Sequence, residues 1–236
     1  VHHDGPLARE RARTKAATYH AIAREKLRAA PDDARALHEC AIQAGVAGCH
    51  DEAIALGRQL VEHPDAPDLA LAWMNLGHSL LETRQFAAAA DAAREALARS
   101  PRMRAARYNH ALAALCLGRM DEVLADCEAM LADEGHDPAA WALSAAAGVL
   151  ADDEARIARA TRVLLERGEP LAPALQAYAA RLEGAGHRAE AHRLEDAARE
   201  AWRATLLALG FVADDTTIEQ AMRQGAAAAD LEQVRA

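Results

Sequence analysis

Aromatic residues, lysines and long apolar runs are scarce in this chain of 236 residues. Aromatic residues make up 3% of it, and Lys15 and Lys26 are its only lysines. There is no run of 18 apolar residues, and the first residues lack the apolar segment of a signal peptide. We therefore expect no membrane contact and a cytoplasmic location. Alanine, the best helix former, supplies about a quarter of the residues, which favours a helical chain.

The charge balance argues against a nucleic-acid partner. The formal net charge is -9, whereas a nucleic-acid-binding surface normally needs a basic stripe that replaces phosphate counterions. We therefore expect no binding to DNA or RNA.

The four cysteines carry no recognisable metal or disulfide pattern. Cys40, Cys49, Cys116 and Cys127 lack the C-x-x-C spacing of zinc sites and lie inside helical patterns. We interpret them as buried, reduced thiols, and we expect no metal and no cofactor. The chain also lacks a plausible nucleophile, general base or set of metal ligands, so we expect no enzymatic activity of its own.

One stretch, residues 70–101, contains a pattern that recurs along the chain. It consists of Trp73, Leu76, Gly77, Leu80, a polar break, Phe86, Ala89, Ala96 and Pro101. Units that begin at Ala34, Ala70, Arg104, Pro138 and Ala172 are spaced by 36, 34, 34 and 34 residues. One position of the first helix is small in every unit: Ala41, Gly77, Ala111, Ala145 and Ala179. Gly48, Gly118 and Gly186 are predicted to end the first helix of their units, as a glycine between two helices often does.

This pattern resembles the tetratricopeptide repeat (TPR), a helix-turn-helix unit of 34 residues. The resemblance implies an all-α fold, a right-handed α-solenoid of about five repeats with flanking N- and C-terminal helices. The boundaries that follow are an N-terminal turn and helix over 1–33, repeats over 34–205, and C-terminal capping helices with a tail over 206–236. It also implies a non-catalytic scaffold for protein–protein interaction.

The resemblance places the first helix of each unit on a concave surface that commonly binds an extended peptide. The implied peptide-binding groove consists of Arg35, His38, Glu39, Met74, Asn75, His78, Tyr108, Asn109 and Gln176. Asn75 and Asn109 occupy the same position in consecutive repeats. Because an amide is both donor and acceptor, stacked asparagines could pair with a peptide backbone whatever its sequence. The alternative interpretation is that asparagine is simply common at this polar position.

The end of the fifth unit is apolar, whereas the cap of a solenoid should be polar. Residues 187–209 predict a long helix with three leucines near its end, and this surface must be covered. We expect a final helix to cover it, with Asp215 or Thr216 as its cap and Thr216 with Glu219 as a capping box. The alternative cover is a homodimer that forms through the C-terminal helices.

The first fifteen residues carry a weaker resemblance. Val1 to Gly5, followed by the basic stretch from Arg9 to Lys15, is similar to the junction between a family 2 (GT-A) glycosyltransferase and a C-terminal TPR domain. A late histidine binds the divalent metal in such enzymes, which would make His2 or His3 its remnant. No Asp-x-Asp motif in a strand context is present, so this resemblance implies an accessory, dimerising or acceptor-binding region. His3 could instead bind copper or nickel with a free amine, if Val1 is the natural start.

Overall fold

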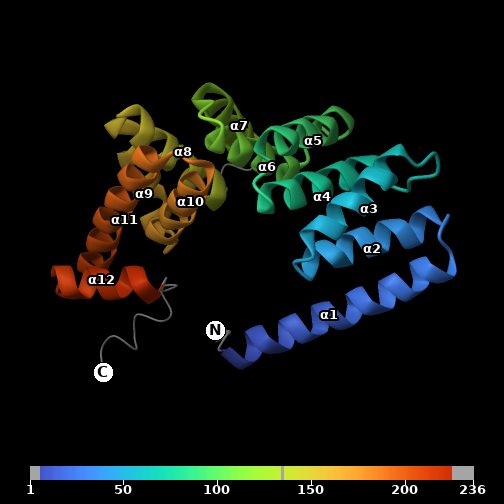
Figure 1. The fold of residues 1–236 in the computed structure, drawn as a ribbon. Coiled ribbons are helices and arrows are strands. Elements are labelled where there is room, and N and C mark those ends of the chain that lie inside the picture. Colours follow the sequence, from blue (N-terminus) through green and yellow to red (C-terminus); the bar gives the residue numbers. More distant parts are fainter. Residues whose placement is uncertain (1–5, 134–135, 225–236) are drawn as a thin grey trace. The chain divides into compact units, whose positions relative to one another are not determined.

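The computed structural model describes residues 6–133 and 136–224. Twelve α-helices and no strand occur in these ranges, which confirms the predicted all-α fold class (Figure 1). The helices are α1 (Pro6–Ala29), α2 (Ala34–Val46), α3 (His50–Glu62), α4 (Leu69–Glu82), α5 (Phe86–Arg99), α6 (Arg104–Cys116), α7 (Met120–Asp133), α8 (Pro138–Ala151), α9 (Glu154–Glu166), α10 (Leu171–Ala185), α11 (Arg188–Ala208) and α12 (Asp215–Gln224). None of these described helices is both long and apolar enough to cross a bilayer.

The helices pack in sequential pairs. Helix α2 packs on α3, α4 on α5, α8 on α9, and α10 on α11. Successive pairs stack as well, because α3 contacts α4, and the first helices α2 and α4 contact each other, as do α8 and α10. The first helices of the predicted repeats begin at or one residue before the residues from which the units are counted. The chain forms two compact units, residues 1–110 and 111–236.

The turn inside each helix pair contains one residue with positive φ. These residues are Gly48 (77°), Arg84 (60°), Gly118 (70°), Asp152 (56°) and Gly186 (93°), and they recur every 36, 34, 34 and 34 residues. In each turn the next amide donates to a carbonyl five residues earlier, at 2.8–2.9 Å. This bond is typical of a helix that ends in a left-handed residue. The three predicted turn glycines are confirmed, and Arg84 and Asp152 adopt the same conformation without being glycine.

Helices α4 and α5 approach each other closely at Gly77. A Cβ placed on Gly77 would lie 3.5 Å from the carbonyl oxygen of Ala89 and 3.5 Å from Cβ of Ala92. Ala89 and Ala93 are fully buried on the facing side of α5. The crossing therefore has space for a methyl group, but a larger side chain would meet the backbone of α5.

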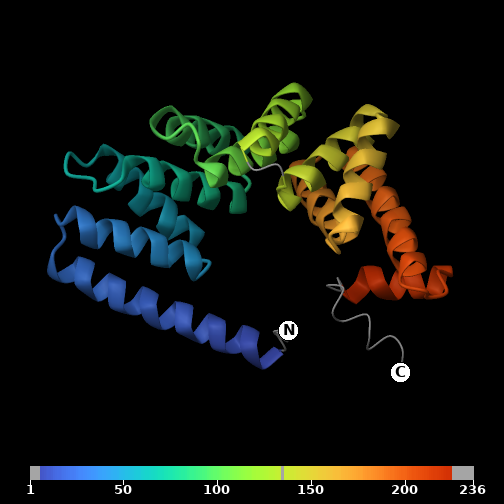
Figure 2. The same ribbon diagram turned by 180° about the vertical axis from the view of Figure 1, so that it is seen from behind.

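Helix α1 packs on α2 through its C-terminal half (Figure 2). Ala23 is fully buried and His20 nearly so, whereas residues 10–15 are all exposed. With 24 residues, α1 is longer than α2, which has 13. The prediction that an N-terminal helix lies against the first repeat holds for this half, and the other half extends past its packing partner.

Helix α12 covers the apolar end of α11, as predicted. Trp202 and Leu206 are fully buried and form a cluster with Ile218 and Ala221 of α12. Asp214 caps α12, so the prediction of Asp215 or Thr216 as the cap was wrong. Oδ1 of Asp214 accepts hydrogen bonds from the Thr217 amide at 2.8 Å and from the Thr217 hydroxyl at 2.7 Å.

The cover provided by α12 is incomplete. Leu207 and Leu209 remain 60% and 48% exposed, since they lie on the side of the chain that α12 does not cover. The homodimer through the C-terminal helices stays a prediction.

Candidate functional site

Three predicted groove residues lie on α2 and differ in what they offer to a ligand. Arg35 is exposed, while His38 and Glu39 are half-buried. Glu39 is already paired, because Lys26 Nζ of α1 lies 2.8 Å from its Oε1. His38 Nε2 is buried and has no hydrogen-bond partner among the described residues. Burial lowers the pKa of His38, with Asp68 opposing the effect, so the neutral imidazole is favoured.

Helix α4 places Asn75 next to His38. Both side chains line one small hollow between α2, α3 and α4. Its volume of about 10 Å³ is enough for one water at most, so the hollow is no ligand pocket. Asn75 is half-buried. The structure therefore places the amide of Asn75 beside the buried Nε2 of His38, which has no partner among the described residues.

The two equivalent asparagines lie in different environments. Asn109 of α6 is only 6% exposed, and its Nδ2 donates a hydrogen bond of 3.3 Å to the carbonyl oxygen of Met74. This bond ties α6 to α4 and occupies one donor of the amide. The neighbouring Tyr108 is half-buried, and His78 on α4 is exposed with its ring packed edge-on against His50 at 6.0 Å. At equivalent repeat positions, Asn109 is therefore buried and joins two helices, whereas Asn75 remains partly accessible to solvent.

Gln176 belongs to the C-terminal unit, where its amide both donates and accepts a hydrogen bond. Its Nε2 donates to the carbonyl oxygen of Met222 at 3.0 Å, and its Oε1 accepts from Trp202 Nε1 at 3.1 Å. Gln176 thereby links α10 to α11 and α12. Its amide contributes to closing the C-terminal end of the fold.

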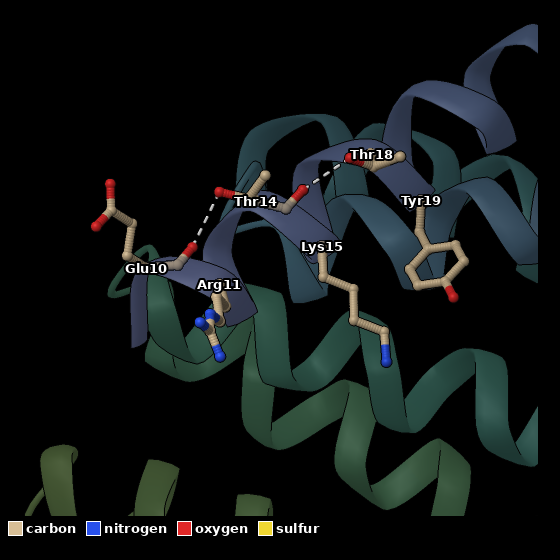
Figure 3. Close-up of a pocket in the computed structure, with 6 residues that line it drawn as sticks. All are labelled: Glu10, Arg11, Thr14, Lys15, Thr18 and Tyr19. Carbon is tan, nitrogen blue, oxygen red and sulfur yellow. Dashed lines mark hydrogen bonds between the residues drawn. The ribbon is translucent and has the colours of Figure 1, made fainter. Parts of the chain in front are cut away.

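The groove predicted from the sequence does not include the exposed half of α1. A hollow of about 650 Å³ is lined there by Glu10, Arg11, Thr14, Lys15, Thr18 and Tyr19 (Figure 3). The hydroxyls of Thr14 and Thr18 donate to carbonyls one turn earlier. Arg11, Lys15 and Tyr19 extend from the same side of the helix (Figure 3), with Lys15 Nζ 5.7 Å from the Tyr19 ring centroid. Every lining residue is exposed, so this is a broad surface and not an enclosed site.

The C-terminal unit contains a second hollow, of about 520 Å³, beside Trp141. The Arg159 guanidinium lies 5.3 Å from the Trp141 ring centroid, a cation–π distance. Arg156 donates to Ser144 Oγ at 3.4 Å and pairs with Asp153 at 3.2 Å. Trp73 lies two repeat periods before Trp141, and the guanidinium of Arg99 likewise lies 5.9 Å from its ring centroid. The repeated contact indicates that these tryptophans stabilise helix packing.

The interpretation of the cysteines as buried thiols is right for three of the four. Burial raises the pKa of Cys116 to about 11 and that of Cys127 to about 12, so both are unreactive at neutral pH. Cys40 is also fully buried. The interpretation is wrong for Cys49, which is exposed because it follows the left-handed Gly48 in the turn between α2 and α3.

The fold occurs among solved structures, although no family model matches the chain and no curated protein matches its sequence. The crystal structure of YrrB, a TPR protein with an unusual peptide-binding site, aligns over 80% of this chain and 96% of YrrB, with 16% identity and a TM-score of 0.53. MamA aligns over 82% and 92% of the two chains, with 18% identity and a TM-score of 0.47. A chain of Naa15/Naa10 bound to HypK-THB aligns over 86% of this chain and 35% of its own, with 16% identity and a TM-score of 0.42.

The likeness to YrrB confirms the TPR-like fold predicted from the 34-residue period. The comparisons give no support to the resemblance to a glycosyltransferase junction. His2 and His3, on which that resemblance drew, lie outside the described residues.

Proposed function

We propose that this chain is a non-catalytic protein-interaction module whose N-terminal unit holds an extended peptide against the accessible faces of α2 and α4. Solenoids of stacked helix pairs commonly use such surfaces to bind peptides. YrrB, which shares the fold, is described as having a peptide-binding site. Both facts support the class of function, and the residues of this chain supply the rest of the argument.

The observation that carries the proposal is the pair formed by His38 and Asn75. The two side chains line the same hollow, Asn75 is half-buried, and Nε2 of His38 has no hydrogen-bond partner among the described residues. An asparagine amide can accept from a backbone N–H and donate to a backbone C=O. A peptide that lies across α2 and α4 would pair with the amide of Asn75 through its main chain, which requires no particular sequence.

The charges on α2 favour an acidic residue in the bound peptide. Arg35 is exposed and lies one helical turn before His38. Glu39, the neighbouring carboxylate, is neutralised by Lys26. An acidic side chain placed one or two residues from the segment at Asn75 would therefore meet Arg35, which has the planar donor fork that suits a carboxylate.

Selection from a random-peptide library displayed on phage would test the proposal. Selected peptides should bind the unmodified protein, and Asn75→Ala should weaken binding about tenfold, since two hydrogen bonds are lost at about 0.5–1.5 kcal/mol each. Gln59→Ala is the matched control, because it removes an exposed amide from α3, outside the proposed face. Fluorescence polarisation measures the affinities, and circular dichroism verifies that both variants fold.

Two results would contradict the proposal. One is a selection that yields no peptide with measurable affinity. The other is a set of peptides that bind Asn75→Ala and Gln59→Ala equally well, which would place recognition on another surface. Hydrogen exchange with bound peptide should protect segments of α2 and α4, and protection confined to residues 111–224 would equally exclude this face.

A further inference from the structure

Three side chains with metal-binding atoms converge where α1, α2 and α3 meet. His20 comes from α1, Cys40 from α2 and Glu52 from α3, and one ligand atom of each lies within 4.8 Å of the other two. His20 and Cys40 are 7% and 0% exposed. The side chain of Glu52 is 33% exposed, which leaves a path to solvent on its side of the cluster. The three residues are far apart in sequence, so no spacing motif reveals them.

An ordinary ion pair does not account for the geometry at His20. Its Nε2 lies 3.2 Å from Oε2 of Glu52, yet this buried nitrogen forms no hydrogen bond with any described residue. The distance is short enough for a hydrogen bond, so the direction between the two groups must be unsuitable. Two ligands of one tetrahedral zinc ion are separated by about 3.3–3.6 Å, given bonds of about 2.0–2.3 Å, and need no hydrogen between them.

The two oxygens of Glu52 face different partners. Oε1 lies 3.2 Å from Nε of Arg24, and Oε2 faces His20. Arg24 therefore orients the carboxylate through one oxygen and leaves the other directed into the cluster. Outer groups that hold a ligand in this way are typical of metal sites.

We propose that His20, Cys40 and Glu52 bind one zinc-like divalent cation. Thiolate sulfur, imidazole nitrogen and carboxylate oxygen are the ligands that Zn²⁺ uses, and three protein ligands with a water in the fourth position is a common arrangement. On binding, the Cys40 thiol releases its proton to solvent as the sulfur–metal bond forms, and His20 coordinates through Nε2 of its neutral ring. The ion would tie α1 to the first helix pair.

Cobalt substitution tests the proposal, because Co²⁺ bound to a thiolate absorbs in the near ultraviolet. The experiment uses the full chain with Cys49→Ser, since the exposed Cys49 is followed by His50 and Asp51 and could bind cobalt at the surface. Titration should give a sulfur-to-cobalt band that saturates at one ion per chain, and Zn²⁺ should displace it. Histidines near the N-terminus cannot produce this band, because they carry no sulfur.

Two further substitutions assign the ligands. Adding Cys40→Ser should abolish the band, and adding Glu52→Gln should weaken cobalt binding by more than about 100-fold, since even outer-shell changes reduce affinity by about 10- to 100-fold. Cys127→Ser is the matched control, because it removes a buried thiol that belongs to no such cluster among the described residues. Zn²⁺ should also raise the melting temperature of Cys49→Ser and leave that of Cys49→Ser with Cys40→Ser unchanged.

The absence of a thiolate band in the Cys49→Ser protein would overturn the proposal. So would a band that persists without Cys40 or that disappears with Cys127→Ser. If Cys40→Ser prevents folding, as judged by circular dichroism, Glu52→Gln decides the question, because the half-exposed Glu52 tolerates an amide. Unchanged cobalt affinity in that variant would then exclude the site.

Discussion

Replacing Gly77 tests how closely α4 and α5 approach each other. A methyl group at this position would lie 3.5–3.6 Å from its neighbours, which is ordinary van der Waals contact. Because alanine favours a helix over glycine by about 0.8–1.0 kcal/mol, Gly77→Ala should stabilise the N-terminal unit by about 1 kcal/mol. Gly77→Leu adds three more carbons against Ala89, Ala92 and the backbone of α5. Overpacking of this kind costs about 1–3 kcal/mol or more, so that α4 and α5 should open locally.

Gly148 provides a comparison within the C-terminal unit. A methyl group there would lie 3.1 Å from Cγ1 of Ile157 and 3.3 Å from the carbonyl oxygen of Asp153. Both distances are tighter than usual, and the second involves backbone that cannot rotate away. The helix-propensity gain is the same as at Gly77, but strain of about 1–3 kcal/mol opposes it. Gly148→Ala should therefore destabilise α8 and α9 by about 1 kcal/mol.

Hydrogen exchange followed by mass spectrometry is the suitable assay, because it measures each helix pair separately in a chain that need not unfold in one step. A change of 1 kcal/mol alters the exchange rate of protected amides about fivefold. Exchange in α4 and α5 should slow in Gly77→Ala and accelerate strongly in Gly77→Leu. If Gly77→Ala destabilises the N-terminal unit as much as Gly77→Leu does, there is no room for a methyl group between α4 and α5 at Gly77. A neutral Gly77→Leu would show that the helices are not closely packed there.

Three further predictions concern hydrogen bonds and backbone conformation. Asn109→Ala should destabilise the N-terminal unit by about 1–2 kcal/mol, because it removes the bond to Met74. Urea unfolding followed by Trp73 fluorescence, in a background with Trp141→Phe and Trp202→Phe, measures this, and an unchanged midpoint would contradict it. Gly118→Ala should lower stability and Arg84→Gly should raise it, each by about 1 kcal/mol in thermal unfolding, because both residues have positive φ. The Arg156 amide bound to Asp153 lowers the pKa of that carboxyl. The stability that this cap contributes is therefore fully present above about pH 4, the pKa of an aspartate in the unfolded chain. It is lost as pH falls through the lower pKa that Asp153 has in the folded protein. The difference in melting temperature between wild type and Asp153→Asn should be constant above about pH 4 and shrink as pH falls from about 4 to about 2, and a difference that stays constant over this lower range would refute the reasoning.

The repeat pattern was predictable because a helix turn must satisfy the same backbone constraint in every unit. Glycine marks three of the five turns in the sequence, and these three were assigned correctly. Arg84 and Asp152 fill the same position with side chains that disfavour it, so a search for glycine alone does not find them. Their conformation follows from packing of the flanking helices, which overrides the local preference.

The candidate site was only partly predictable, because equivalence in sequence is not equivalence in environment. Asn75 and Asn109 share a repeat position, but Asn109 is buried and bonded to Met74 while Asn75 is half-buried without such a bond. Glu39 reads as a groove residue, yet Lys26 of the preceding helix neutralises it. These differences depend on what the neighbouring helix presents, and the period of the repeat does not contain that information.

The helical class, the 34-residue period and three of the five turns could be read from the sequence, because these depend on residues close together along the chain. Which polar groups remain accessible, and that His20, Cys40 and Glu52 converge from three helices, emerged from the fold. Helix crossings set the distances between residues of different helices. A local pattern specifies which face of a helix is buried, but the neighbour packed against that face decides which atoms meet.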